Sequence, residues 1–337
     1  MTEVEKQSLS GQEIVHSARP TALVAGGRGV GDILRLTPLI RVFAQLGYEV
    51  DVLVAPDYPK TLELLEGAPE IRNLFYLRSS WRNLGGEKLE GLERNCYDIA
   101  AITFLATLTN DYQKLVRARR TIVMGRREWW REGDYGNAET IAREVGWEGQ
   151  LPPPFAMASE RKFNLPAGTV AMHPGCKPDW AWKKWHGFDE LAEQFPSVAI
   201  IGMPDDLNNE TTYFKRPFRW PAHVQDFIGL SLPDTAALLR ECVAIISNDS
   251  GLMHLSVAMR TPTFGIFGLT SQQHEAMRTP NMFAITKQLP CEPRCRKRPL
   301  GRRDCEYHVE CLKTLTAAEV QQKVVTILPS LNNPHER

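Results

Sequence analysis

Short apolar runs alternate along this chain with segments whose apolar residues recur at helical spacing, and this alternation restricts the fold more than any other feature. The run Thr21 to Ala25 leads into a glycine-rich loop, after which a helical pattern starts at Asp32 and ends at Gly47. A second apolar run, at 48–54, follows at once. Strands that alternate with helices form a parallel sheet covered on both faces. The sequence therefore predicts an α/β fold.

The alternation occurs in two blocks, which a proline-rich stretch separates. Residues 147–168 contain four prolines and little apolar periodicity, as is typical of a domain boundary. The length of 337 residues also favours two domains, because one domain usually takes roughly 150 residues. We predict a loose N-terminal arm (1–19), an N-terminal α/β domain (20–150), a linker (151–168), a C-terminal α/β domain (169–314) and a C-terminal helix (315–330).

The same patterns predict individual elements. In the N-terminal domain we expect strands near Asn73 and Asp98 and at 121–124, and helices near 58–66, 112–119 and 137–145. In the C-terminal domain the clearest unit runs from Val243 to Phe267, where a strand, a turn, a helix and a second strand follow one another.

Composition and charge narrow the class of protein. Apolar residues make up 43% and charged residues 24%, which is ordinary for a globular protein. Forty basic residues balance forty acidic ones, so no global field attracts nucleic acid or an anionic membrane. The N-terminus lacks the pattern of a secretory signal, and no apolar run is long enough to span a bilayer. We expect a cytoplasmic protein whose contact with a membrane, if any, is peripheral.

The glycine-rich loop GGRGVGD, at 26–32, lies between the first strand and the first helix. It resembles a dinucleotide-binding turn, but the last required glycine is replaced by Asp32, whose carboxylate would repel a pyrophosphate. Two interpretations of Asp32 remain. Its side chain could cap the helix, or it could act as a general base at the mouth of a cleft. Arg35, one turn along, could hold that carboxylate ionised or bind an acidic acceptor.

A second turn, NDSG at Asn248 to Gly251, also joins a strand to a helix. The free amides and the positive dipole end of such a helix favour an anion, although an ordinary helix cap would look the same. Upstream, the stretch 173–188 contains Lys183, which could neutralise a leaving phosphate or could be a solvated surface group. We expect Trp185 and His254 to pack in the interior.

Taken together, four motifs resemble glycosyltransferase family 9, the bacterial heptosyltransferase family. They are GDILRLTPLIR at 31–41, HPG at 173–175, KKW at 183–185 and NDSGLMHLSVAMRTPTFGIFG at 248–268. The likeness keeps the same order through DFIGLSLPDTAALL and the cysteine-rich tail, so it extends over most of residues 22–325. Because independent motifs agree in order and spacing, the resemblance is more specific than any motif alone.

This resemblance implies a B-type glycosyltransferase fold, in which two tandem Rossmann-like domains face each other across a cleft. The acceptor would bind the N-terminal domain, and a nucleotide sugar, usually ADP-heptose, the C-terminal domain. Inverting transfer to a hydroxyl of a lipopolysaccharide core or of a protein is implied, with no metal needed for catalysis. By matching positions, Asp32 looks like the catalytic base; Lys183, Asp249, Ser250, Gly251 and, more loosely, Glu210 look like donor-binding residues; Gly31, Arg35 and Arg28 belong to the acceptor side or its loop.

Four cysteines near the C-terminus have the spacing C-x3-C-x9-C-x5-C. Cys291, Cys295, Cys305 and Cys311 supply four soft ligands that could enclose structural iron or zinc, or they could be reduced thiols that merely pack. Some family 9 relatives that modify autotransporter proteins look like iron binders in this region. Six basic residues between 294 and 303 could contact phosphates or an acidic acceptor, or could form a solvated loop.

Two other function classes stay open. One is an NAD-dependent oxidoreductase, which the broken glycine pattern disfavours. The other is a nucleic-acid-binding protein that uses the basic cysteine cluster, which would leave the paired α/β domains without a purpose, so no nucleic acid is expected. An oligomer is compatible with the sequence, which does not predict its size.

Overall fold

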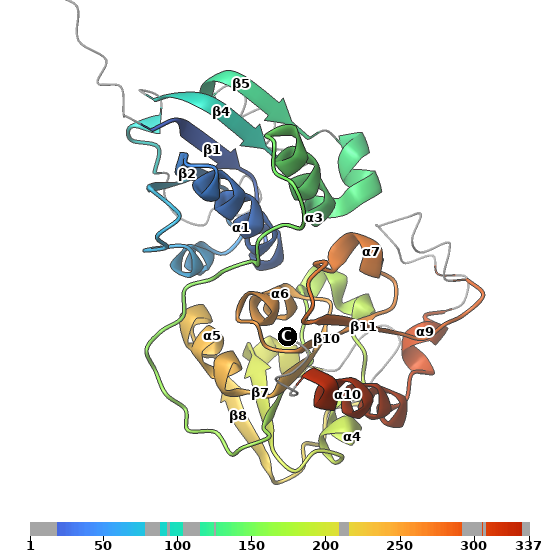
Figure 1. Ribbon diagram of the computed structural model, residues 1–337. Coiled ribbons are helices and arrows are strands. Elements are labelled where there is room, and N and C mark those ends of the chain that lie inside the picture. Colours follow the sequence, from blue (N-terminus) through green and yellow to red (C-terminus); the bar gives the residue numbers. More distant parts are fainter. Residues whose placement is uncertain are drawn as a thin grey trace, which may run out of the picture.

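Two parallel β-sheets, one on each side of the proline-rich linker, form the framework of the chain (Figure 1). The computed structural model describes residues 19–77, 88–92, 95–103, 115–124, 126–208, 216–291, 305 and 308–331, with the backbone alone for 126–132 and 331. The strand order is β3-β2-β1-β4-β5 in the first sheet and β11-β10-β9-β6-β7-β8 in the second. Both sheets therefore have the doubly wound α/β form that the alternating pattern predicts.

The N-terminal sheet is buried on both faces. Successive residues of a strand point to opposite sides, so Ala22 and Val24 pack in one apolar cluster and Leu23 and Ala25 in another. The elements of this domain are β1 (Thr21–Ala25), α1 (Val30–Gln45), β2 (Glu49–Val54), the 3-10 helix η1 (Pro59–Leu64), β3 (Asn73–Tyr76), β4 (Cys96–Ile102), β5 (Arg117–Val123) and α3 (Arg126–Glu144).

The helix expected at 112–119 is wrong over residues 117–119, whereas the strand expected at 121–124 is confirmed as part of the same element. Residues from Arg117 to Val123 form β5, an edge strand that pairs in parallel with β4. An edge strand exposes much of its surface, and here arginines occupy the exposed positions, so the apolar alternation that marks a half-buried strand is missing. The segment 104–114 lies outside the described residues. The helix expected near 58–66 is the short 3-10 helix η1, which has a proline in its first turn.

The C-terminal domain repeats the layered arrangement, with apolar clusters on both faces of its sheet. Its central strands β6 and β9 are neighbours, although the two strands β7 and β8 lie between them in the chain. The elements are β6 (Val170–His173), η3 (Pro178–Lys183), α4 (Phe188–Ala192), β7 (Val198–Gly202), η4 (Pro204–Leu207), β8 (Val224–Ile228), α5 (Leu232–Glu241), β9 (Ala244–Asn248), α6 (Gly251–Ala258), β10 (Thr263–Phe267), α7 (Gln272–Glu275), β11 (Met282–Thr286), α9 (Glu310–Lys313) and α10 (Ala317–Leu331).

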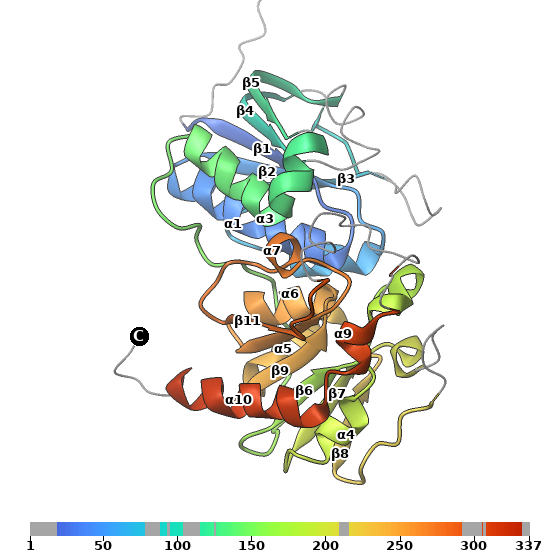
Figure 2. The ribbon, with the colours of Figure 1, turned by 90° about the vertical axis from the view of Figure 1, so that its right-hand side faces the viewer.

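Helices of the two domains meet directly. In Figures 1 and 2, α1 and α3 of the N-terminal domain face α6 and α7 of the C-terminal domain, and both helix pairs α1/α6 and α3/α7 are in contact. The C-terminal helix α10 lies on the far side and packs against α4 (Figure 2). Among the described residues, no helix is long and apolar enough to cross a membrane.

Glycines allow the domains to approach this closely. A Cβ atom on Gly31 would lie 2.5 Å from His254 of α6, and one on Gly251 would lie 2.8 Å from Val30 of α1. Gly133 of α3 has φ +67°, and a Cβ there would lie 2.2 Å from the carbonyl oxygen of His274. Side chains of each helix therefore pack against a glycine of the other, which is possible because neither glycine carries a side chain.

Candidate active site

The candidate site lies where the order of strands reverses in each sheet. The reversal falls between β1 and β4 in the N-terminal domain and between β6 and β9 in the C-terminal domain. In open α/β sheets, ligands bind beyond the carboxyl ends of the strands at such points. The glycine loop follows β1, and the turn Asn248 to Gly251 follows β9, so each switch point carries one of the two motifs predicted from the sequence.

Asp32 occupies the first turn of α1 and serves the helix start. Its Oδ2 accepts a hydrogen bond from the backbone N–H of Gly29 at 2.9 Å, so the helix-capping interpretation is correct in part, with Gly29 as the N-cap residue. Its side chain nevertheless remains 36% exposed. A capped carboxylate that still reaches solvent is held in place and is accessible to a ligand, so capping and a base role are compatible at this position.

Arg35 binds three carboxylates at once and is itself buried, with 5% of its side chain exposed. Its Nη2 donates to Asp32 Oδ1 at 2.6 Å and lies 3.0 Å from Asp134 Oδ2, while its Nη1 donates to Glu275 Oε2 at 2.8 Å. Asp134 belongs to α3, and Glu275 belongs to α7 of the other domain. The guanidinium thus ties the candidate base to both domains.

The carboxylates around Arg35 differ in their protonation. Burial raises the pKa of Asp134 to about 7, against the opposing effect of Arg35. Burial also acts to raise the pKa of Glu275, but Arg35 and the adjacent His274 outweigh it and hold that pKa well below its usual range. The pKa of Arg35 stays above its usual value, because the three carboxylates outweigh the effect of burial. The cluster therefore keeps an ionised Glu275–Arg35 pair at neutral pH.

Arg28 of the glycine loop takes part in a second link between the domains. It donates to Asp57 Oδ1 at 2.7 Å, and Lys177 of the C-terminal domain donates to Asp57 Oδ2 at 3.0 Å. Burial acts to raise the pKa of Asp57, but the hydrogen bond from Lys177 and the charges of both cations lower it below its ordinary value. The structure therefore places Arg28 in a charge-paired bridge at the domain boundary.

The turn after β9 is held from two sides. Asn248 accepts the backbone N–H of Trp185 at 2.9 Å and donates to the carbonyl oxygen of Pro174 at 2.7 Å, and Ser250 caps α6 by accepting from the N–H of Met253. Trp185, with 1% exposure, packs in the interior as expected. This rigid turn presents the N-terminus of the eight-residue helix α6 toward the domain boundary.

Lys183 lies at the same helix start. Its Nζ donates to Asp249 Oδ2 at 2.9 Å, and only 12% of its side chain is exposed. Burial acts to lower the pKa of Lys183, but Asp249 outweighs this effect and raises it, so the ammonium remains charged. The predicted donor residues Lys183, Asp249, Ser250 and Gly251 are thus brought together around one helix N-terminus.

A buried histidine stands behind this turn. His173 Nε2 lies 3.3 Å from Asp206 Oδ2, and His173 Nδ1 lies 2.9 Å from Ser250 Oγ. Burial acts to raise the pKa of Asp206, but hydrogen bonds from His173 and from the N–H of Met203 lower it, so the carboxylate is ionised and accepts the Nε2 proton. In the neutral imidazole Nδ1 is then the acceptor, and the Ser250 hydroxyl donates to it.

Several functional candidates escaped the sequence analysis. Asp206 follows the end of β7 and Glu275 follows the loop after β10, so a search for polar residues beyond strand ends would have found both. Asp134 gives no such signal, because it lies in a helix far along the chain. Glu210 and Cys295 lie outside the described residues.

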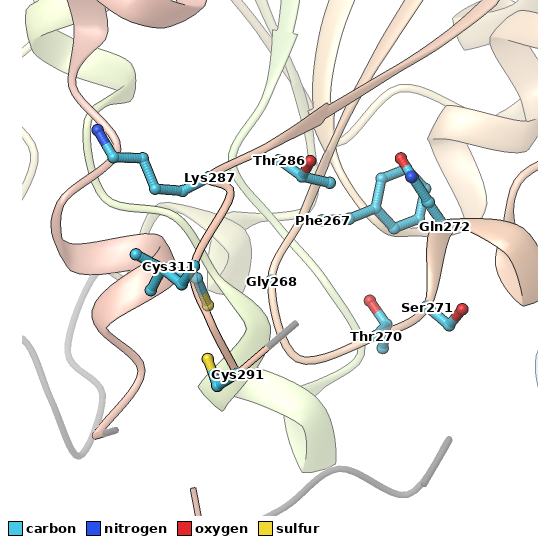
Figure 3. Close-up of a pocket in the computed structure, with 10 residues that line it drawn as sticks. Phe267, Gly268, Thr270, Ser271, Gln272, Thr286, Lys287, Cys291 and Cys311 are labelled. Atoms are coloured by element: carbon cyan, nitrogen blue, oxygen red, sulfur yellow. The ribbon is translucent and has the colours of Figure 1, made fainter. Parts of the chain in front are cut away.

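The cysteine cluster is partly described. The side chains of Cys291 and Cys311 line a hollow beyond the ends of β10 and β11, and their sulfur atoms point toward one another (Figure 3). Cys305 Sγ accepts the N–H of Val309 at 3.4 Å. Within the described part of the chain, no three His, Cys, Asp or Glu side chains form a group that could hold a metal ion.

Comparisons with known proteins complete this description. The model of glycosyltransferase family 9 (heptosyltransferase) matches residues 141–301. This segment, just under half of the chain, is therefore similar to glycosyltransferase family 9. The family 9 segment includes the turn after β9, Lys183 and His173, so the resemblance drawn from these motifs is confirmed.

An individual relative shows the same similarity. The chain is 28% identical over 137 residues to lipopolysaccharide heptosyltransferase 1 of Escherichia coli K12; the match covers 39% of this chain and 43% of that protein. The chain thus matches less than half the length of this curated relative.

Solved structures match the fold over nearly the whole chain. The Escherichia coli ADP-heptose lipopolysaccharide heptosyltransferase II has a TM-score of 0.65 at 19% identity, covering 93% of this chain and 100% of that one. The iron-containing dodecameric glycosyltransferase TibC of enterotoxigenic Escherichia coli has a TM-score of 0.57 at 18% identity, covering 93% and 77%. The predicted fold of two Rossmann-like domains, the B-type glycosyltransferase fold, is confirmed.

Proposed function

We propose that this protein is an inverting glycosyltransferase that moves heptose from ADP-heptose to an acceptor hydroxyl. The observation that carries the proposal is the Lys183–Asp249 pair at the N-terminus of α6, where a fixed cation and free helix amides offer a site for a nucleotide diphosphate. The family 9 relatives support this choice of donor, because solved neighbours are named as ADP-heptose enzymes.

The proposed mechanism is a single displacement. Asp32 takes the proton from the acceptor hydroxyl, whose oxygen attacks the anomeric carbon while the bond from that carbon to the diphosphate oxygen breaks. ADP departs with the electron pair of that bond. Lys183 and the α6 amides stabilise the negative charge that develops on the diphosphate, and they are already in place before the reaction, so little reorganisation is needed. This scheme assigns the cation's role to the protein and calls for no metal.

The position of the base favours an acceptor bound to the N-terminal domain. Asp32 starts α1 of that domain, whereas Lys183 and Asp249 belong to the other, so the two substrates would meet at the domain boundary. We propose a lipopolysaccharide-core hydroxyl or a protein hydroxyl as acceptor; the curated relative acts on lipopolysaccharide by its name. Such a protein would work in the cytoplasm, at the inner face of the inner membrane if its acceptor is a lipid.

The test uses purified protein with ADP-heptose and heptose-deficient lipopolysaccharide, and separately with a bacterial protein extract that lacks heptosylated proteins. ADP release and the mass increase of the acceptor by one heptose unit are measured. UDP-glucose and GDP-mannose serve as control donors. Transfer from ADP-heptose alone supports the proposal. Transfer only from a control donor would contradict ADP-heptose as the donor and would leave the reaction class in place. Release of no nucleotide under any condition would contradict the reaction class.

We further propose that Cys291, Cys295, Cys305 and Cys311 hold a structural iron or zinc ion. The facing thiols of Cys291 and Cys311 and the iron content of the neighbour TibC support this idea, whereas the described cysteines by themselves lack a three-ligand arrangement. Binding would therefore require Cys295 and a closer approach of Cys305. Elemental analysis of protein purified without chelators should find one iron or zinc per chain, and less in a Cys291→Ser/Cys311→Ser variant. Protein free of both metals would contradict this second proposal.

A further inference from the structure

The Arg35 side chain links the candidate base directly to the C-terminal domain. One nitrogen of its guanidinium donates to Asp32 at 2.6 Å, and the other donates to Glu275 at 2.8 Å. A guanidinium is planar and rigid, so its two nitrogens cannot move independently. Any displacement of Glu275 therefore turns the nitrogen that holds Asp32.

Among the described residues, two groups hold the Asp32 carboxylate. Besides Arg35, Asp32 is held by the backbone N–H of Gly29, which fixes one oxygen and leaves the carboxylate able to rotate about that bond. Asp134 lies 3.0 Å from the same Arg35 nitrogen and competes for it. If Glu275 withdrew, Arg35 would be left between two carboxylates of its own domain, and the orientation of Asp32 would no longer depend on the donor-binding domain.

The charges around this contact come from every element packed there. Asp32 and Arg35 belong to α1, Asp134 to α3, and His274 and Glu275 to α7, with His274 Nδ1 at 3.1 Å from Glu275 Oε1. His254 of α6 also interacts electrostatically with both Arg35 and Glu275. The Lys183 ammonium interacts electrostatically with Glu275. Glu275 is thus the carboxylate that faces both the base cluster and the donor-site cation.

Glu275 also sits close in sequence to the donor side. Residues 268–271 connect the carboxyl end of β10 to α7, and β10 is the neighbour of β9, whose end carries the donor turn. α7 in turn packs against α3 of the N-terminal domain. A shift of the C-terminal domain relative to the N-terminal one must therefore move Glu275.

We propose that Glu275 is a positioning residue for the catalytic carboxylate: through Arg35 it holds Asp32 in its working orientation only while the two domains are closed on each other. Asp32 is then correctly oriented only when the C-terminal domain contacts the N-terminal domain, so proton transfer is limited to the assembled site. This inference rests on the proposed function for its catalytic consequence. Its geometric part, that Glu275 fixes Asp32, stands independently.

The experiment compares Glu275→Gln with Glu139→Gln in the full-length chain. Glu139 of α3 pairs with Arg278, just after α7, at 3.0 Å, so it is a second ion pair across the same helix contact that does not touch Arg35. We expect Glu275→Gln to lower kcat by about 10- to 100-fold with little change in KM for ADP-heptose, because a misplaced base slows the step without weakening donor binding. Glu139→Gln should leave kcat within about twofold. Glu275→Asp, which keeps the charge, should recover part of kcat.

A second readout does not depend on turnover. Since Asp32 accepts the Gly29 N–H, hydrogen exchange of that amide reports the orientation of the carboxylate. Glu275→Gln should speed the exchange of Gly29 at least about fivefold relative to Glu139→Gln. Equal exchange and equal kcat in the two variants would overturn the inference. A wild-type protein that is inactive while Gly29 still responds to Glu275→Gln would instead contradict the proposed function and keep the positioning role of Glu275.

Discussion

Lys183 Nζ donates to Asp249 Oδ2 at 2.9 Å, and this pair joins the loop after β6 to the turn after β9. Both side chains are largely buried, so each charge depends on the other for compensation. The pair therefore has two roles that experiments can separate, one in stability and one in binding a diphosphate.

Lys183→Met should reduce both stability and ADP affinity. The free energy of unfolding should fall by about 3–5 kcal/mol because Asp249 would be left buried without a partner. Affinity for ADP should fall by about 1.5–3 kcal/mol through loss of a charged hydrogen-bond donor. The double variant Lys183→Met/Asp249→Asn should recover most of the lost stability but none of the ADP affinity that Lys183 provides. Calorimetric titration with ADP and urea unfolding measure the two effects, and full recovery of ADP affinity in the double variant would refute the role of Lys183.

Asp206→Asn should disturb the donor turn from behind. Asn cannot fix the proton on His173 Nε2 as the ionised carboxylate does, so the hydrogen bond from Ser250 to Nδ1 is weakened. We expect a loss of about 1–3 kcal/mol in unfolding free energy, together with weaker ADP binding. Asp205→Asn is the matched control, since Asp205 is adjacent and exposed. Identical melting curves and ADP affinities for the two variants would show that the His173 contact has no such role.

His254 makes stability depend on pH. Burial, followed by the charge of Arg35, lowers its pKa to about 4, against 6.5 in the unfolded chain. Between pH 6.5 and 4 the unfolded state binds a proton that the native state does not, so stability from this group is full above pH 6.5 and falls by about 1.4 kcal/mol per pH unit on acidification. His254→Leu lacks this slope. Urea unfolding at pH 6.5 and 5 measures this. On going to pH 5, the free energy of unfolding of the wild type should fall by about 1–2 kcal/mol more than that of the variant. The same difference between the two proteins at both pH values would contradict the shifted pKa.

Gly133→Ala should loosen the domain contact. Its φ of +67° disfavours any side chain, and a Cβ would lie 2.2 Å from the His274 carbonyl oxygen, next to Glu275. Gly146 has a φ of +87° and nothing within 4 Å of such a Cβ, so Gly146→Ala reports the backbone strain alone. Strain alone costs about 1–3 kcal/mol, and Gly133→Ala should cost more and also slow turnover. Thermal unfolding and kcat measure both, and equal effects of the two substitutions would deny the close approach of α3 and α7.

The sequence alone was enough to predict the α/β architecture of both domains. Alternating apolar patterns predicted the parallel sheets, since buried strands such as Thr263–Phe267 are almost uniformly apolar. The pattern predicted only the end of the edge strand Arg117–Val123, as a strand at 121–124, and failed over its first residues, where exposure replaces the apolar signal.

The site was predictable only in its local parts. Asp32 and the turn at Asn248 follow strands directly, so their place at the sheet ends could be inferred from the chain alone. The contacts of Arg35 with Asp134 and Glu275 join residues that are 99 and 240 positions away, as the numbering shows, and only the packing of α3 and α7 brings them together. No local pattern encodes such a contact.

The central claim is that Asp32 activates an acceptor for transfer from ADP-heptose, and Asp32→Asn tests it most directly. Release of ADP from ADP-heptose in the presence of heptose-deficient lipopolysaccharide or acceptor protein should fall by about 100-fold or more, the usual contribution of a general base. The affinity for ADP should stay within about twofold, because Asp32 belongs to the N-terminal domain and Lys183 still binds the diphosphate. ADP release at the wild-type rate from Asp32→Asn would contradict the account.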